Sequence, residues 1–175
     1  MEAVWETLLP AMAPNPIGLD TTIFQSLAFK LNGLSLPLVE GELWSPVSEK
    51  LAQRKFQVSE NEAGVKSVSF YLHGKDHRIT MEMDHGMETL YLGTESHITS
   101  KLNDHLPYTQ NMRRRIGASG AWVKQNEYRA KIYLTETPGS IMYTFRFANN
   151  RMTWTSQLRH SLFGSRNLAI LKGEF

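Results

Sequence analysis

Two glutamates that stand two residues apart have a spacing suited to chemistry. They belong to the stretch Glu60-Asn61-Glu62-Ala63-Gly64, which leads into alternating polar and apolar residues from Val65 to Phe70. In an extended strand, Glu60 and Glu62 would share a face, and paired carboxylates can act as acid and base when burial separates their pKa values. The alternative is turn capping, in which the carboxylates and Asn61 accept backbone N–H groups. The sequence favours capping.

Serines and histidines, which supply nucleophiles and metal ligands, form no catalytic pattern. No serine has lysine three positions later, no tyrosine has asparagine two positions later, and no Lys-Thr-Gly triplet occurs. The run Gly117-Ala118-Ser119-Gly120 falls short of the Gly-x-Ser-x-Gly nucleophile elbow. His73, His77 and His85 stand at or beside turns, where we expect exposed side chains, because a metal site needs a third well-aimed ligand. We therefore assign no catalytic residue, no metal site and no cofactor.

The bulk composition is that of one globular domain, and it excludes several function classes. The chain has 175 residues, 41% hydrophobic residues, a net charge of +2 and no cysteine. Without cysteine there is no disulfide, thiolate zinc site or thiol nucleophile. The mild charge does not indicate nucleic acid, and the run Arg113-Arg114-Arg115, which lacks interleaved aromatics, predicts a solvated loop.

Hydropathy gives no sign of a membrane span or an export signal. No segment approaches the roughly 20 apolar residues that cross a bilayer as a helix. The N-terminus lacks the basic region of a signal peptide. The compartment stays open, because a chain without cysteine suits any redox environment.

Helical periodicity marks residues 1–46, which we expect to form a helical and linker segment. The apolar spacing that predicts a first helix is that of Trp5, Leu8, Leu9 and Met12. A second helix is predicted after Asp20, a good N-cap, and ends near Gly33. Its apolar stripe consists of Ile23, Leu27 and Leu31. Residues 34–46 contain two prolines and a glycine, and they predict an extended linker.

From residue 47 onward the pattern is that of strands, which predicts a β-domain over 47–175. The expected strands are 54–59, 65–73, 77–84, 87–93, 119–125, 127–136, 140–148 and 151–159, with a further one over 167–172. Residues 94–116 predict a less regular connection. Short consecutive strands with tight turns indicate an antiparallel meander, and closure removes unpaired edges. We therefore expect a mainly β fold, a lipocalin-like up-and-down barrel of about eight strands, preceded by one or two short helices.

Large aromatic residues on the expected inward faces are candidates for lining a ligand pocket. They are Trp122, Tyr143, Phe145 and Trp154. A barrel of roughly eight strands has an interior that holds side chains or one small ligand. The competing interpretation is a barrel filled by these rings, because aromatic side chains dominate packed cores. The size of the rings favours the filled barrel.

Two stretches carry a resemblance to a known family. "RKFQVSENEAGVKSVSF" and the later "ASGAWVKQNEYRAKIYLTETPGSIMYTFRFANNRMTW" resemble the lipocalin-like C-terminal domain of serine hydrolases of the class C β-lactamase and penicillin-binding-protein type. In that family a similar pattern opens the barrel, and here its residues are Asn61, Gly64, Ser67 and Phe70. The resemblance implies that these four residues are a structural signature, with Gly64 permitting a bend that a Cβ would strain.

The resemblance implies an accessory role and no catalysis by this chain. The family's Ser-x-x-Lys and Tyr-x-Asn motifs lie in a preceding domain, and neither occurs here. The expected partner is that catalytic domain, with a homo-oligomer as a second expectation. The alternative is a free-standing barrel that binds a small apolar ligand, as lipocalins and fatty-acid-binding proteins do. An enzyme that uses Glu60 or a histidine ranks last.

Overall fold

Two compact units make up the chain, residues 1–37 and residues 38–175. The computed structural model describes residues 6, 10–12, 20–52, 54–103, 113–161 and 164–175. The first unit contains helix α1 (Thr21–Asn32). The predicted helix over Trp5 to Met12 lies largely outside the described residues.

Helix α1 begins where the sequence predicts it. The Asp20 carboxylate accepts hydrogen bonds from the N–H groups of Thr22 and Ile23, at 3.0 and 3.1 Å, which satisfies donors that a helix start leaves unpaired. Gly33 follows the last turn with a φ of −83°, so this glycine does not supply a left-handed conformation. None of the residues of α1 is buried.

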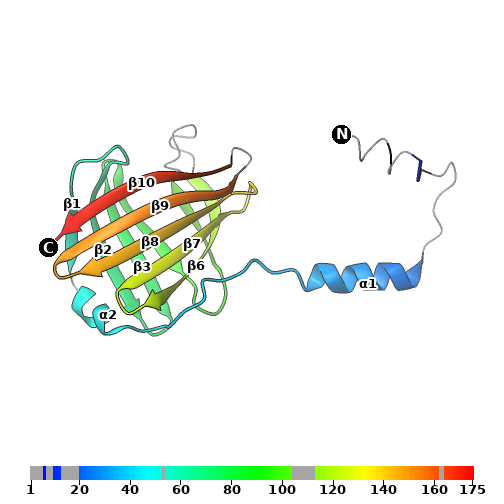
Figure 1. The fold of residues 1–175 in the computed structure, drawn as a ribbon, viewed down its shortest axis with the longest axis horizontal. Coiled ribbons are helices and arrows are strands. Elements are labelled where there is room, and N and C mark those ends of the chain that lie inside the picture. The colour runs from blue at the N-terminus through cyan, green and yellow to red at the C-terminus, as the bar shows by residue number, and fades with distance from the viewer. Residues whose placement is uncertain (1–5, 7–9, 13–19, 53, 104–112, 162–163) are drawn as a thin grey trace. The chain divides into compact units, whose positions relative to one another are not determined.

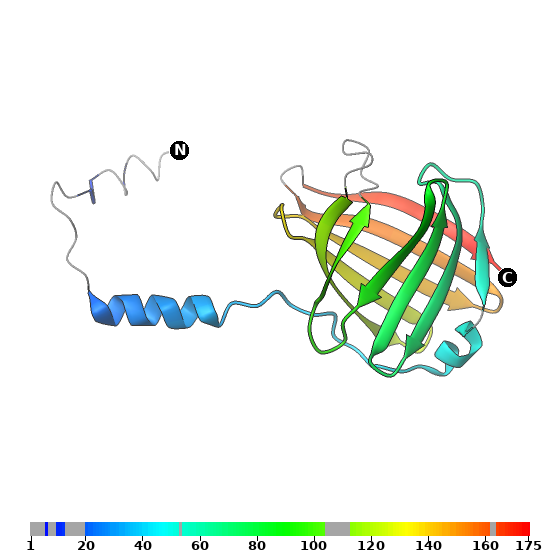
Figure 2. The ribbon, with the colours of Figure 1, turned by 180° about the vertical axis from the view of Figure 1, so that it is seen from behind.

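The second unit is an up-and-down barrel of antiparallel strands (Figures 1 and 2). The strands are β1 (Lys55–Val58), β2 (Val65–His73), β3 (Asp76–Met83), β4 (Gly86–Leu92), β5 (Ile98–Asn103), β6 (Arg113–Lys124), β7 (Glu127–Leu134), β8 (Ser140–Ala148), β9 (Arg151–Ser161) and β10 (Gly164–Glu174). Their spatial order is β4-β3-β2-β1-β10-β9-β8-β7-β6-β5. The predicted fold class is confirmed, with ten strands in the sheet.

Three segments differ from the expectations. Strand β5 lies inside the stretch predicted to be irregular. The arginine run begins β6 and is not a loop, with Arg114 half-buried and Arg115 exposed. Helix α2 (Pro46–Leu51) begins at the last residue of the expected linker, and the Ser45 hydroxyl caps it by accepting the Val47 N–H at 3.2 Å.

Residues 38–45 are part of the barrel unit. Strands β4 and β5 stand at opposite ends of the hydrogen-bonded order, so they do not pair with each other. Glu42 exchanges two backbone hydrogen bonds with Trp122, at 2.8 and 2.9 Å, on the part of β6 that lies beyond its pairing with β5. Gly93, just after β4, also bonds to the β6 backbone. The expected domain division after residue 46 therefore differs from the observed division after residue 37.

The turn between β1 and β2 is fixed by an amide and a glycine. The Asn61 side chain donates to the carbonyls of Ser59 and Val65, both at 2.8 Å, and accepts the Val65 N–H at 3.1 Å. Gly64 has a φ of +67°, and a Cβ there would lie 2.8 Å from Asp84 Oδ2. A side chain at this position would meet both backbone strain and a clash.

Aromatic rings from opposite walls meet inside the barrel. Phe70 on β2 lies 5.0 Å from Phe145 and 5.1 Å from Phe147, both on β8, measured between ring centroids. Strands β2 and β8 are separated in the sheet by β1, β10 and β9. Edge-to-face packing of this kind fills the space between the walls. The barrel is therefore packed at the level of Phe70.

Candidate ligand site in the barrel interior

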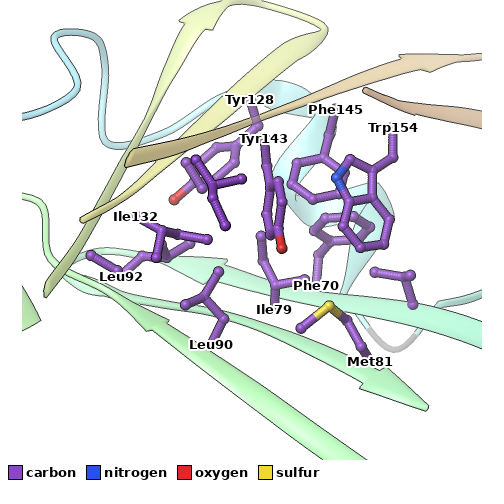
Figure 3. Close-up of a cluster of buried hydrophobic side chains, with 14 of the residues drawn as sticks. Phe70, Ile79, Met81, Leu90, Leu92, Tyr128, Ile132, Tyr143, Phe145 and Trp154 are labelled. Atoms are coloured by element: carbon purple, nitrogen blue, oxygen red, sulfur yellow. The ribbon is translucent and has the colours of Figure 1, made fainter. Parts of the chain in front are cut away.

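Three of the four predicted pocket residues form one cluster. Phe145 on β8 pairs with Trp154 on β9, and their rings lie 5.3 Å apart. Tyr143 lies 4.9 Å from Trp154, and all three side chains are buried. Figure 3 shows these rings facing Ile79, Met81 and Leu90 on the opposite wall. All three facing side chains are apolar, so the cluster lies in an apolar environment.

Trp122, the fourth predicted residue, lies apart from this cluster. Its ring packs on Tyr128 at 5.3 Å and on Phe147 at 5.8 Å. Its backbone pairs with Glu42. Trp122 thus lies where residues 38–45 join the barrel. Among the described residues, its ring makes no contact with the ring of Trp154.

Two indole N–H groups are buried inside the barrel without a hydrogen-bond partner among the described residues. They belong to Trp122, 2% exposed, and Trp154, 5% exposed. A buried donor left unpaired costs about 1–3 kcal/mol, so each such group needs an explanation. The Trp154 donor lies within the aromatic cluster, where an acceptor on a bound molecule would satisfy it.

A buried polar chain lies beside Trp122. His77 Nδ1 lies 2.9 Å from the Tyr128 hydroxyl, and His77 Nε2 lies 3.1 Å from the Leu43 carbonyl oxygen. A neutral imidazole satisfies both contacts by donating from Nε2 and accepting from the tyrosine at Nδ1. Burial lowers the pKa of His77, partly offset by the Leu43 carbonyl, and burial raises the pKa of Tyr128.

The expectation that His77 is exposed is wrong, because its side chain is 1% exposed. Its partners are 51 and 34 residues distant in the sequence, so no local pattern reveals the contact. His85, by contrast, is 41% exposed in its side chain and lies 2.9 Å from Glu88. Among the described residues, no group of three or more potential ligands has metal-site geometry.

The glutamate pair does not form a buried acid–base site. Glu60 and Glu62 are both exposed, and the turn is held by the Asn61 side chain between them. The remaining signature residues, Ser67 and Phe70, are buried, and the Ser67 hydroxyl donates to Glu82 at 2.9 Å.

Within the described part of the chain, no helix has the length and apolar character needed to cross a membrane.

Ten antiparallel strands follow one another around the sheet, and β1 pairs with β10, so the second unit has the fold of an up-and-down barrel. The chain is similar in fold to a fatty acid-binding protein from brain tissue of Drosophila melanogaster, crystallised without citrate inside, with a TM-score of 0.52. The two share 8% sequence identity, and the match covers 70% of this chain and 98% of that chain. No family model and no curated protein sequence matches the chain.

This likeness supports the barrel part of the family resemblance and leaves the serine hydrolase part without support. At 8% identity it establishes the shared fold alone. Function has to be argued from the site, because one fold hosts many unrelated functions.

Proposed function

We propose that the barrel binds a small, mainly apolar molecule that carries one hydrogen-bond acceptor. The observation that carries this proposal is the buried Trp154 N–H, which has no partner among the described residues. An acceptor in the cluster of Trp154, Tyr143 and Phe145 would pair with that donor, while the apolar part of the ligand would lie against Ile79, Met81 and Leu90.

The proposed role is binding without catalysis. The cluster offers aromatic surface and one unpaired donor, whereas the glutamates that suggested acid–base chemistry are exposed. The aromatic contacts at Phe70 leave little room at that level, so the ligand would be small. A side chain that turns in its rotamer would admit it, and this is a modest rearrangement for a binding site.

Calorimetric titration with an uncharged aliphatic ketone, 2-heptanone, tests the proposal, because this probe is small and mainly apolar and carries one acceptor. We expect saturable binding to the full chain and about tenfold weaker binding to Trp154→Phe, because that change removes the N–H donor while keeping an aromatic ring. Trp44→Phe is the matched control, since Trp44 is 51% exposed. The indole N–H resonance of Trp154 should shift on titration. Binding that is absent, or equal in both variants, would overturn the proposal.

A second candidate, the accessory domain of a serine hydrolase, is favoured by the way residues 38–51 join the barrel. Glu42 pairs with Trp122 through its backbone, and the Ser45 hydroxyl donates to the Gln125 carbonyl. These bonds hold residues 42–45 on the barrel, and a domain ahead of them would be connected to the barrel through residues 1–37. Reading the gene upstream of Met1 tests this candidate. An open frame with Ser-x-x-Lys and Tyr-x-Asn supports it, and a frame without them removes it.

A further inference from the structure

The outer surface of the barrel has a polar hollow over β7, β8, β9 and β10, which lie side by side (Figure 1). Its volume is about 280 Å³. The residues that line it are Arg129, Met142, Thr144, Arg146, Thr155, Gln157, Arg159, Asn167 and Ile170. Three of these carry a positive charge and none carries a negative charge.

Strand register brings these residues together. One row across the sheet consists of Arg129, Thr144, Thr155 and Ile170, which pair in turn from β7 to β10. The next row contains Met142, Gln157 and Asn167. Residues directly opposite each other in antiparallel strands have neighbouring side chains on the same face. The hollow thus has hydroxyl and amide groups within a border of arginines.

A buried carboxylate orients two of the arginines. Glu127 is 4% exposed in its side chain, and it accepts from Arg129 Nε at 2.9 Å and from Arg146 Nε at 2.8 Å. Burial would raise the pKa of Glu127, but the hydrogen bonds from Arg146 and Arg129 outweigh it and lower that pKa. Glu127 therefore stays charged and fixes both guanidinium groups at one side of the hollow.

The third arginine approaches from the other side. Arg159 Nη2 donates to Gln157 Oε1 at 3.1 Å, and Gln157 Nε2 donates to Asn167 Oδ1 at 2.8 Å. Gln157 is neutral, so its hydrogen bond with Arg159 does not neutralise the charge of Arg159. Three guanidinium groups against one carboxylate leave an excess of positive charge, which favours an anion.

We propose that this hollow binds a small, doubly charged oxyanion, the group found in a phosphate monoester or a short dicarboxylate. Guanidinium groups match the planar geometry of carboxylate and phosphate oxygens, and the hydroxyls of Thr144 and Thr155 add neutral donors. The volume suits a small molecule or one anionic group. The site lies on the outer face, so it is independent of the interior site proposed above.

Two-dimensional NMR of the labelled full chain with phenyl phosphate, and separately with malonate, tests this inference at low ionic strength. We expect saturable shifts confined to β7, β8, β9 and β10 for at least one probe, and about tenfold weaker binding to Arg159→Gln. Arg159 is chosen because it donates to Gln157 and not to Glu127, so its loss leaves the partners of Glu127 in place. The probe that binds identifies the phosphate or the dicarboxylate source.

Arg78→Gln is the matched control, because it removes the same charge from β3, where Arg78 lies over the Tyr71 ring. Its affinity for either probe should equal that of the unmodified chain. Failure of both probes to saturate, or equal weakening by Arg159→Gln and Arg78→Gln, would overturn the inference. Neither result bears on the interior site, which the titration with 2-heptanone reports.

Discussion

The outer faces of two walls of the barrel differ in how their charged side chains are paired. On the β1–β4 wall, defined as strands β1 to β4 with their turns, Lys55 pairs with Glu82, Lys66 with Asp84 and Lys75 with Glu95. These six side chains are all at least 37% exposed. The β7–β10 wall, defined as strands β7 to β10, has one such exposed pair, Arg151 with Glu174. In addition, one buried carboxylate on this wall binds two arginines, and a third arginine lies beside neutral groups.

This difference separates charged groups that support the fold from charged groups that remain able to bind a ligand. Exposed pairs contribute little to stability, because water screens both ions and ordering the side chains costs entropy. A buried carboxylate depends on its partners, because an uncompensated charge in the interior is costly. We therefore expect the β7–β10 wall to be sensitive to loss of charge and the β1–β4 wall to depend on its backbone turn.

The largest expected effect comes from removing both partners of Glu127. Arg129→Leu combined with Arg146→Leu should lower the free energy of unfolding by about 3 kcal/mol at neutral pH, since it leaves a buried carboxylate unpaired. Burial then raises the pKa of Glu127, so the folded state binds a proton more readily than the unfolded state. The deficit should shrink as pH falls. Urea unfolding at several pH values measures both effects.

A double variant at two arginines that do not contact Glu127 controls for the change in net charge. Arg78→Leu with Arg151→Leu removes the same two charges, and Arg151 pairs with Glu174 where both side chains are well exposed. This double variant should lose less than about 1 kcal/mol of the free energy of unfolding. If the two double variants were equally unstable at all pH values, Glu127 would not be the cause.

The second largest effect should come from Asn61 on the β1–β4 wall. Asn61→Ala removes the three side-chain hydrogen bonds of the turn and should cost about 2 kcal/mol, because partly buried backbone groups lose their partners. Glu60→Ala, at an exposed position in the same turn, should change stability by less than about 0.5 kcal/mol. Thermal unfolding separates the two. A larger loss at Glu60 would restore the capping role that the sequence suggested for the glutamates.

The sequence predicted the strands with a clear period of two and missed β5, which lacks one. Strand β8 alternates inward and outward residues from Ile141 to Ala148, so its period and the turns around it identify it. Strand β5 has an exposed Ile98 and a buried Leu102, and it pairs only with β6 in the sheet, so pairing and not pattern defines it. The Ser45-Pro46 start of α2 was readable as an N-cap followed by proline.

The sequence also predicted only some of the residues of the two candidate sites. Tyr143, Phe145 and Trp154 come together because β8 and β9 are sequence neighbours in one hairpin. The contact of His77 with Tyr128 joins β3 to β7, which come together only in the folded barrel. Arg129 and Arg146 meet Glu127 within the β7–β8 hairpin, but no sequence motif indicates that this glutamate is buried. The hollow on the outer face has no sequence motif, since its residues are scattered outward positions of four strands.

A smaller effect is expected from His77, which connects the β1–β4 wall to Tyr128 on β7. The pKa of His77 is lowered in the folded state, so the unfolded state takes up a proton first. Stability should therefore fall as pH drops below about 6.5, the ordinary histidine value. His77→Gln should remove that part of the pH dependence. The nearby Asp76 carboxylate opposes the shift, so Asp76→Asn should strengthen the dependence. Denaturant midpoints between pH 5 and pH 8 measure it.

The smallest effect should come from an exposed pair on the β1–β4 wall. Lys75 Nζ lies 2.7 Å from Glu95 Oε1, but the two side chains are 68% and 65% exposed. Lys75→Gln should change the free energy of unfolding by less than about 0.5 kcal/mol, and added salt should erase the change, because solvent already screens the pair. Comparing urea midpoints in low and high salt checks this. A loss as large as that of the Asn61 variant would mean that both walls depend on ion pairs, and the contrast between them would fail.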